Sequence, residues 1–81
     1  MSKFFRGVRL EKRLYPSDFK DLGITEKGLD ENYNAFGQYY LGSDGCIYEF
    51  TGNPSEGEYV RHLEVEEFKR YFNESNEEGR N

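Results

Sequence analysis

The side chains that could form a catalytic or metal-binding set are few in this chain of 81 residues. His62 is the only histidine and Cys46 the only cysteine, so one Cys–His pair is all that the sequence could supply. A lone cysteine on a strand is more often a small core hydrophobe than a nucleophile. One cysteine forms no internal disulfide, and no Cys/His cluster suited to zinc is present. We therefore expect no catalytic residue, no metal and no cofactor, and a protein that is not an enzyme.

Two short segments resemble ligand loops and fail at the positions that matter. Residues 30–34, Asp-Glu-Asn-Tyr-Asn, match the opening of an EF-hand calcium loop. Ala35 replaces the glycine of position 6 and Leu41 replaces the bidentate glutamate of position 12, so no calcium site is expected. Residues 42–46 lack the lysine and the following helix of a phosphate loop, and turn formation explains them.

Charge is distributed unevenly along the chain. The net charge is −5, with +4 in residues 1–14, −7 in residues 15–60 and −2 in residues 61–81. A net acidic chain repels a phosphate backbone, so nucleic acid is a disfavoured partner. The acidic middle predicts a negative patch that meets a partner protein with a basic surface. Its expected members are Asp18, Asp21, Asp30, Glu31, Glu56 and Glu58.

Aromatic residues supply much of the apolar content, with seven Phe and seven Tyr. Tyrosines on a sheet can stack the bases of single-stranded nucleic acid when basic residues flank them. The tyrosines in question are Tyr39, Tyr40, Tyr48 and Tyr59. Their neighbours along the chain are the acids Asp44, Glu49, Glu56 and Glu58, which have the wrong sign. Use of these tyrosines in the core or in a protein interface is therefore the favoured interpretation.

The N-terminal third predicts a strand followed by two short helical turns. Alternation within Phe4–Tyr15 favours one strand, clearest over Arg6–Lys12, which Pro16 ends. Ser17 or Asp18 is expected to cap a first short helix that stops at Gly23, with Phe19 and Leu22 facing the core. Thr25 is expected to cap a second turn that carries Leu29 and Tyr33. Gly28 disfavours helix there, so an irregular loop is the alternative.

The clearest local signal is Asp44-Gly45 between two aromatic-rich runs, within Phe36–Thr51. A two-residue type I′ turn with positive φ at Gly45 predicts a β-hairpin. That register places Tyr39, Leu41, Cys46, Tyr48 and Phe50 on one face. A three-residue loop, Ser43-Asp44-Gly45, would place Glu49 among apolar residues, and we disfavour it for that reason.

The C-terminal third predicts a loop, a strand and a helix. Residues 52–57 have loop composition, Glu58–Leu63 is the expected strand, and Glu64–Asn73 is the expected helix. Val65, Phe68 and Phe72 form its apolar stripe, which we expect to pack against the face that carries Tyr48 and Phe50. Residues 74–81 contain no apolar residue and predict a disordered acidic tail.

Together these elements predict a single α+β domain over residues 1–73. We expect a small antiparallel sheet of three or four strands, with the C-terminal helix packed on one face. No apolar run reaches the ~18 residues of a membrane span, and residues 1–13 lack the apolar stretch of a signal peptide. These observations predict a cytoplasmic protein with no membrane partner, and they leave the oligomeric state open.

The function that remains after these exclusions is protein binding. We expect a small acidic inhibitor or regulator, such as a phage-encoded antagonist of a host nucleic-acid-binding or defence protein, acting in the host cytoplasm. Its carboxylates would imitate the phosphate charges of DNA. One alternative is an adaptor or assembly subunit that binds a partner through exposed tyrosines. Another is a weak nucleic-acid binder that uses the basic N-terminal segment.

Overall fold

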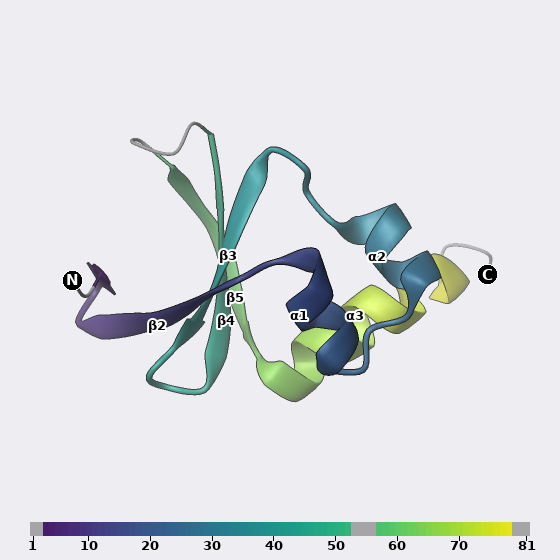
Figure 1. Cartoon of the computed structure of the whole chain (residues 1–81), viewed down its shortest axis with the longest axis horizontal. Coiled ribbons are helices and arrows are strands. Elements are labelled where there is room, and N and C mark those ends of the chain that lie inside the picture. The colour runs from purple at the N-terminus through teal and green to yellow at the C-terminus, as the bar shows by residue number, and fades with distance from the viewer. Residues whose placement is uncertain (1–2, 53–56, 79–81) are drawn as a thin grey trace.

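The protein is an α+β domain in which an antiparallel sheet carries three helices at one end (Figure 1). The computed structural model describes residues 3–52 and 57–78. The sheet has five strands in the order β1-β2-β3-β4-β5, so the predicted count of three or four was wrong. The elements along the chain are β1 (Lys3–Phe5), β2 (Val8–Leu14), α1 (Pro16–Asp21), α2 (Glu26–Asn32), β3 (Gly37–Gly42), β4 (Cys46–Thr51), β5 (Glu58–Glu64) and α3 (Val65–Glu78).

The additional strand comes from a hairpin inside the segment for which one strand was predicted. Phe5 lies opposite Val8, so Arg6 and Gly7 form a two-residue loop between β1 and β2. Arg6 has φ 52° and Gly7 has φ 81°. Positive φ at both central residues is the requirement of a type I′ turn. The sequence did not predict this turn for two reasons. The partial alternation of polar and apolar residues continues across the loop, and arginine is uncommon at positive φ.

The two short helices form as expected, with one change of cap. Tyr15 precedes helix α1, Pro16 is its first residue, and the Tyr15 N–H donates to the Asp18 carboxylate at 2.8 Å. Neither Ser17 nor Asp18 is the cap residue, because proline favours the first helical position. Gly23 has φ 99° and ends the first turn, and the Thr25 hydroxyl caps α2 by accepting from the Gly28 N–H at 2.9 Å.

The β3–β4 hairpin uses the three-residue loop that the sequence argument disfavoured. Leu41 lies opposite Ile47 and Tyr39 opposite Glu49, which leaves Ser43, Asp44 and Gly45 in the loop. Gly45 has the expected positive φ, 83°, and Asp44 does not. The predicted two-residue turn and its register were therefore wrong.

The corrected register places the main core on the opposite side of β4 from the predicted one. Phe68 and Phe72 are 1% and 0% exposed, and they pack with Tyr39 and Ile47. Phe19 of α1 completes this aromatic cluster, with ring centroids 5.1 Å from Tyr39 and 5.5 Å from Phe68. We call this side of the sheet the helix face. The prediction that α3 packs against Tyr48 and Phe50 was wrong, because successive residues of a strand point to opposite faces.

A second, smaller core occupies the other side of the sheet, which we call the aromatic face. Leu10, Tyr48 and Phe50 are its buried residues, and every residue packed against them comes from the β-strands. The sheet curls at bulges in β2 and between β4 and β5. As a result Phe5 of edge strand β1 stacks on Tyr59 of edge strand β5, with ring centroids 5.1 Å apart.

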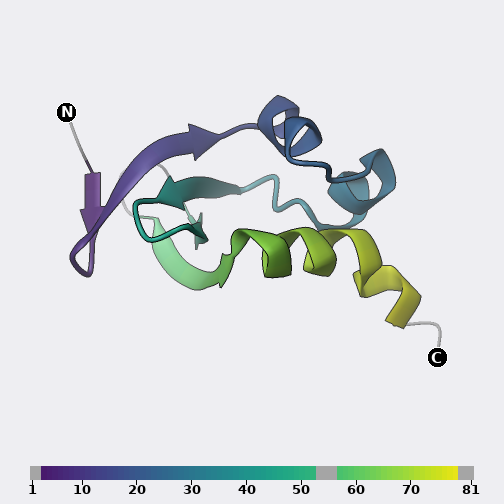
Figure 2. The same cartoon turned by 90° about the horizontal axis from the view of Figure 1, so that it is seen from below.

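Helix α3 is longer than the sequence indicated. It was predicted to end at Asn73, and its backbone remains helical to Glu78. The last part of the predicted tail, residues 79–81, lies outside the described residues. Seen from below, α3 begins at the end of β5 and runs away from the sheet under α1 and α2, so the helices extend the molecule along its 41 Å axis (Figure 2).

The contact between α2 and α3 depends on Gly28. A Cβ at this position would lie 2.5 Å from the Phe72 carbonyl oxygen, which is backbone and cannot rotate away. The Asn32 side-chain amide also donates to that oxygen, at 3.0 Å. Glycine is therefore required for close approach of the two helices, and the short helix forms despite the low helix propensity of this residue.

We predict that Gly28→Ala destabilises the domain, although alanine is intrinsically the better helix former. The added methyl group has to move the helices apart, for which we expect a loss of about 1–3 kcal/mol in the free energy of unfolding. Urea denaturation measures this loss. Lys27→Ala, at the exposed neighbouring position, is the control and should change stability little. A stabilised Gly28→Ala protein would contradict the close helix contact.

We also predict that Phe68→Ala costs about 3–5 kcal/mol, since it empties a fully buried site between α3 and the sheet. Phe36→Ala is the matched control, because Phe36 is 84% exposed and should change stability by no more than about 0.5 kcal/mol. Thermal and urea melts of both variants make the comparison. Equal midpoints for the two would mean that α3 does not anchor this core.

Candidate functional site

The helices of the fold are net negative, and the N-terminal hairpin is net positive. Helices α1 and α2 with their connections, residues 16–33, carry five acids and two bases, and α3 also carries five acids and two bases. We call these three helices the helical layer, which therefore has net charge −6. The β1–β2 hairpin, residues 3–14, carries five bases and one acid. β1 and the β1–β2 turn lie at the end of the molecule away from the helices, and β2 runs from there to α1, where Lys12 pairs with Asp18 (Figure 1).

The structure brings together part of the predicted acidic patch. Asp21 is an exposed residue at the end of α1, and Asp30 and Glu31 are exposed on α2, which contacts α1. Glu58 is the first residue of β5 and lies at the sheet end of the molecule, away from these helices (Figure 1). Glu56 lies outside the described residues.

Asp18, the remaining member, is used by the fold. Its carboxylate accepts the Tyr15 N–H at 2.8 Å and forms an ion pair with Lys12 Nζ at 3.3 Å. The hydrogen bond from the Tyr15 backbone and the nearby Lys12 charge hold the pKa of Asp18 below its ordinary value. Asp18 therefore joins α1 to β2, and it is a poor candidate for a partner contact.

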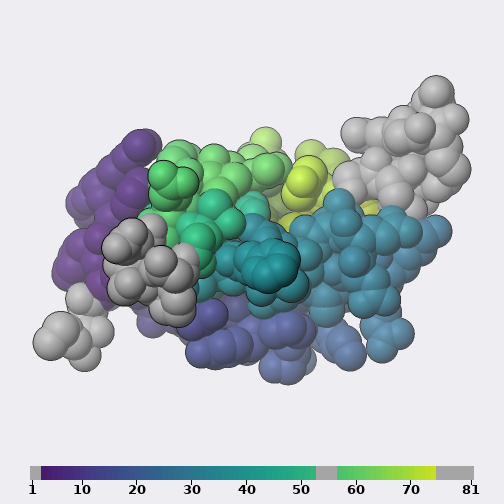
Figure 3. Space-filling model, turned by 90° about the horizontal axis from the view of Figure 1, so that it is seen from above, coloured from purple at the N-terminus to yellow at the C-terminus, as the bar shows by residue number. Residues whose placement is uncertain are grey.

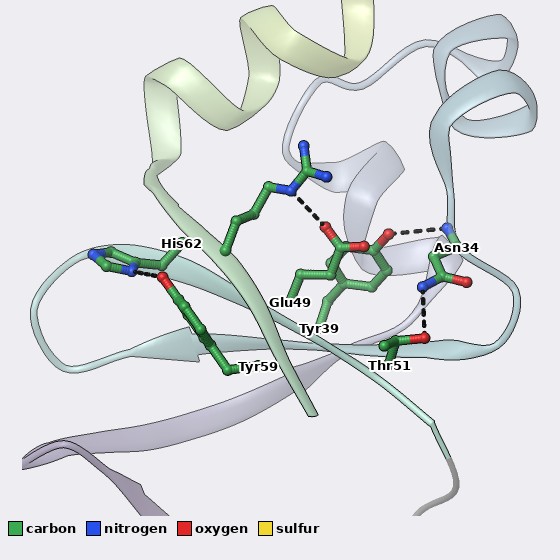
Figure 4. Close-up of polar contacts among 7 residues, drawn as sticks. Asn34, Tyr39, Glu49, Thr51, Tyr59 and His62 are labelled. Carbon is green, nitrogen blue, oxygen red and sulfur yellow. Dashed lines mark hydrogen bonds and ion pairs between the residues drawn. The ribbon is translucent and has the colours of Figure 1, made fainter. Parts of the chain in front are cut away.

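Of the acids that the sequence placed beside the tyrosines, Asp44 contacts the Tyr48 hydroxyl, and Glu49 lies on the helix face opposite Tyr39. Glu49 is 7% exposed on the helix face, where its Oε1 is 3.4 Å from Arg61 Nε (Figure 4). Burial raises the pKa of the neighbouring Tyr39, whose hydroxyl oxygen accepts the Asn34 N–H at 2.9 Å. Asn34 also donates to the Thr51 hydroxyl, so this polar group fastens the α2–β3 connection to the sheet.

Cations also lie against the rings of the aromatic face. Lys3 Nζ lies 4.9 Å from the centre of the Tyr40 ring. The Arg6 guanidinium lies 4.8 Å from the Phe5 ring and 4.7 Å from the Tyr59 ring. The argument from sequence neighbours was therefore incomplete, because the fold brings cations from β1 and the β1–β2 turn against these rings.

An exposed aromatic residue next to this face was missed by sequence reasoning. Phe36 is 84% exposed, in the connection from α2 to β3. It lines an open hollow of about 560 Å³ together with Arg13, Gln38 and Thr51. Teal atoms of the α2–β3 region protrude at the centre of the space-filling view (Figure 3). Phe36 looked like part of the aromatic strand, and no sequence signal separated it from its buried neighbours.

The tyrosines are mostly withdrawn from solvent. Tyr39 and Tyr48 are buried, and Tyr15, at 51% exposure, is the most accessible of those described. The half-buried ones are Tyr33, Tyr40, Tyr59 and Tyr71. The structure thus offers one well-exposed tyrosine to a partner.

Cys46 and His62 lie on the aromatic face without forming a nucleophile and base. His62 stacks on Tyr48 with ring centroids 4.8 Å apart, and its Nδ1 is hydrogen bonded to the Tyr59 hydroxyl at 2.7 Å (Figure 4). Burial and the nearby Asp44 charge raise the pKa of the Cys46 thiol. A thiol with a raised pKa is protonated at neutral pH and is a weak nucleophile.

Further comparisons add no candidate chemistry. Within residues 3–52 and 57–78, no three His, Cys, Asp or Glu side chains gather in a way that could hold a metal ion. In the same ranges, no helix combines the length and apolar character needed to cross a membrane. No family model, no curated protein and no solved structure matches this chain. The function therefore has to be argued from its own surfaces.

We predict that Tyr48→Phe raises the pKa of Asp44. The Tyr48 hydroxyl donates to Asp44 Oδ2 at 2.6 Å, and this bond is the main reason that the Asp44 pKa lies below its ordinary value. A lowered folded-state pKa stabilises the protein above the unfolded-state pKa, and this stabilisation is lost as the pH falls through the folded-state value. The stability difference between the two proteins should therefore be largest near neutral pH and shrink below about pH 4.

NMR titration of the carboxyl carbons measures the Asp44 pKa directly. Tyr71→Phe is the control, because the Tyr71 ring packs on Phe72 and Arg61 and does not contact Asp44. An Asp44 pKa that is the same in the native and Tyr48→Phe proteins would refute this role of the hydroxyl.

Proposed function

We propose that the protein is a non-enzymatic inhibitor or regulator that binds a basic surface of a partner protein through its helical layer. The observation that carries this proposal is the separation of charge by the fold. Acids that are scattered along the sequence gather in three helices with net charge −6, and the β1–β2 hairpin, with net charge +4, reaches these helices only at the end of β2, where Lys12 pairs with Asp18. A predominantly negative surface of this kind steers a partner of opposite sign and fixes its orientation.

The centre of the proposed contact is the α1–α2 surface. Asp21, Asp30 and Glu31 are exposed, and none of them has an ion-pair partner among the described residues. Their charges are therefore not neutralised locally. Other acids of the layer are less available, since Glu26 pairs with Lys20 at 3.5 Å and Glu66 with Lys69 at 3.6 Å.

The most specific form of the proposal is that these carboxylates imitate DNA phosphates. The partner would then be a protein whose basic surface normally binds nucleic acid, such as a host nucleic-acid-binding or defence protein opposed by a phage protein. Association through such a surface weakens steeply with added salt, because the Debye length falls from about 10 Å at 0.1 M to about 3 Å at 1 M. Duplex DNA should compete for the same surface of the partner.

We predict that the triple variant Asp21→Lys, Asp30→Lys, Glu31→Lys slows association with the partner strongly at low salt. The partner is first identified by mass spectrometry after capture on the immobilised protein. Association rates and dissociation constants are then measured on the two purified proteins at several salt concentrations. We expect the association rate to fall by about tenfold or more, since steering contributes factors of about 10–1,000.

The matched control is Glu11→Lys, Glu58→Lys, Glu64→Lys, which makes the same change of charge on exposed strand residues. It should slow association much less. If both triple variants slow association equally, net charge and not the helical layer is responsible. An unchanged rate and salt slope for the α1–α2 variant, with its fold confirmed by circular dichroism, would overturn the proposal.

A further inference from the structure

Three cations on the sheet side of the molecule are paired with aromatic rings and not with carboxylates. Lys3 lies over Tyr40, and Arg6 lies over Phe5 and Tyr59. Arg13 lies over the Tyr15 ring, 5.0 Å from its centre. No carboxylate lies within ion-pair distance of Lys3, Arg6 or Arg13 among the described residues. Their positive charge is therefore not neutralised by the fold.

These cations and their rings form one continuous track. Arg13 lines the hollow that contains Phe36, and it lies directly opposite Tyr40 in the sheet. Tyr40 is covered by Lys3 of β1, and Phe5 follows on the same strand. We call this alternating set the aromatic track. Its members in spatial order are Phe36, Arg13, Tyr40, Lys3, Phe5, Arg6 and Tyr59.

We propose that the aromatic track binds single-stranded nucleic acid. Its cations supply contacts to phosphates, and its exposed ring, Phe36, supplies a surface on which an unpaired base stacks. Phe36, at 84% exposure, is the ring with the most open face. A duplex keeps its bases stacked on one another, so an aromatic side chain gains this contact only with single strands. The inference is independent of the proposed function, because the track lies on the sheet and outside the helical layer.

Base stacking, and not charge, decides between this ligand and an acidic protein segment. Both would be attracted to Lys3, Arg6 and Arg13, but only nucleic acid places an aromatic ring next to every negative charge. Glu11 of β2 pairs with Arg9 at 2.9 Å, and two other carboxylates lie near the ends of the track. Glu58 lies opposite Thr51 of the Phe36 hollow, and Asp44 is bonded to Tyr48 at the β3–β4 hairpin. The middle of the track is thus left positive within a net acidic protein.

The test measures fluorescence anisotropy of a labelled oligothymidylate of about 20 nucleotides at about 50 mM salt. With three phosphate contacts, the logarithm of the binding constant should fall with the logarithm of salt concentration with a slope of about −2. The double variant Lys3→Gln, Arg13→Gln should bind about tenfold or more weakly. Glu58→Gln should bind more tightly, since it removes a repelling carboxylate.

The chain provides a closely matched control. Lys27 and Arg70 also lack an ion-pair partner among the described residues, and they lie on helices α2 and α3. Lys27→Gln, Arg70→Gln therefore removes one lysine and one arginine, as the track variant does, from the other end of the molecule. We expect it to leave affinity within about twofold.

Stacking is tested separately from charge. Phe36→Ala should weaken binding of the oligothymidylate by about fivefold or more and leave binding of an abasic strand of equal length unchanged. The proposal would be overturned if the protein bound the oligothymidylate and the abasic strand with equal affinity. It would also be overturned if the track and control variants lost the same affinity, because binding would then be a general attraction of a polyanion. The absence of any binding at low salt would overturn it directly. Poly-glutamate that competes as well as the oligothymidylate would instead identify an acidic protein as the ligand.

Discussion

The register of β4 against β3, set by the loop Ser43-Asp44-Gly45, determines which side chains enter each of the two cores. β4 lies between β3 and β5, and its residues alternate between the faces. Ile47 points to the helix face and meets the core that contains Phe68, and Tyr48 points to the aromatic face. A shift of one residue would exchange these two sets and leave α3 without a complementary surface.

This dependence explains why the sequence predicted the elements better than their faces. Local signals located both short helices, the turn at Gly45, the strand before α3 and the apolar stripe of α3. They failed on the register because Glu49 was judged unsuitable for a buried position. Burial is tolerated there because Arg61, which lies directly opposite on β5, pairs with its carboxylate at 3.4 Å. A partner 12 residues away along the chain is not visible in the local pattern of polar and apolar residues.

The candidate sites were also predicted only in part, because distances between residues in the fold cannot be read from the local sequence. The sequence predicted a negative patch from acids that are near one another along the chain. The fold does place Asp21, Asp30 and Glu31 on neighbouring short helices. It separates Glu58 from them and uses Asp18 to hold α1 to β2. The basic N-terminal segment lies mostly away from these acids, and Lys12 at the end of β2 is its one residue that pairs with an acid of the helical layer among the described residues. Neutralisation requires proximity, and net charge along a sequence does not report proximity.

The aromatic face links stability to the proposed ligand site. β1 and β5 are the two edges of the sheet, and no strand joins them directly. The gap is bridged by Phe5 stacked on Tyr59, with Arg6 over both rings. Each such cation–π contact contributes only about 0.5–1 kcal/mol at an exposed site, so Arg6 holds the edges together weakly. A phosphate that contacts Arg6 does not need to displace a carboxylate, because none lies within ion-pair distance of Arg6 among the described residues. The contacts that complete this side of the fold therefore leave its positive charge available.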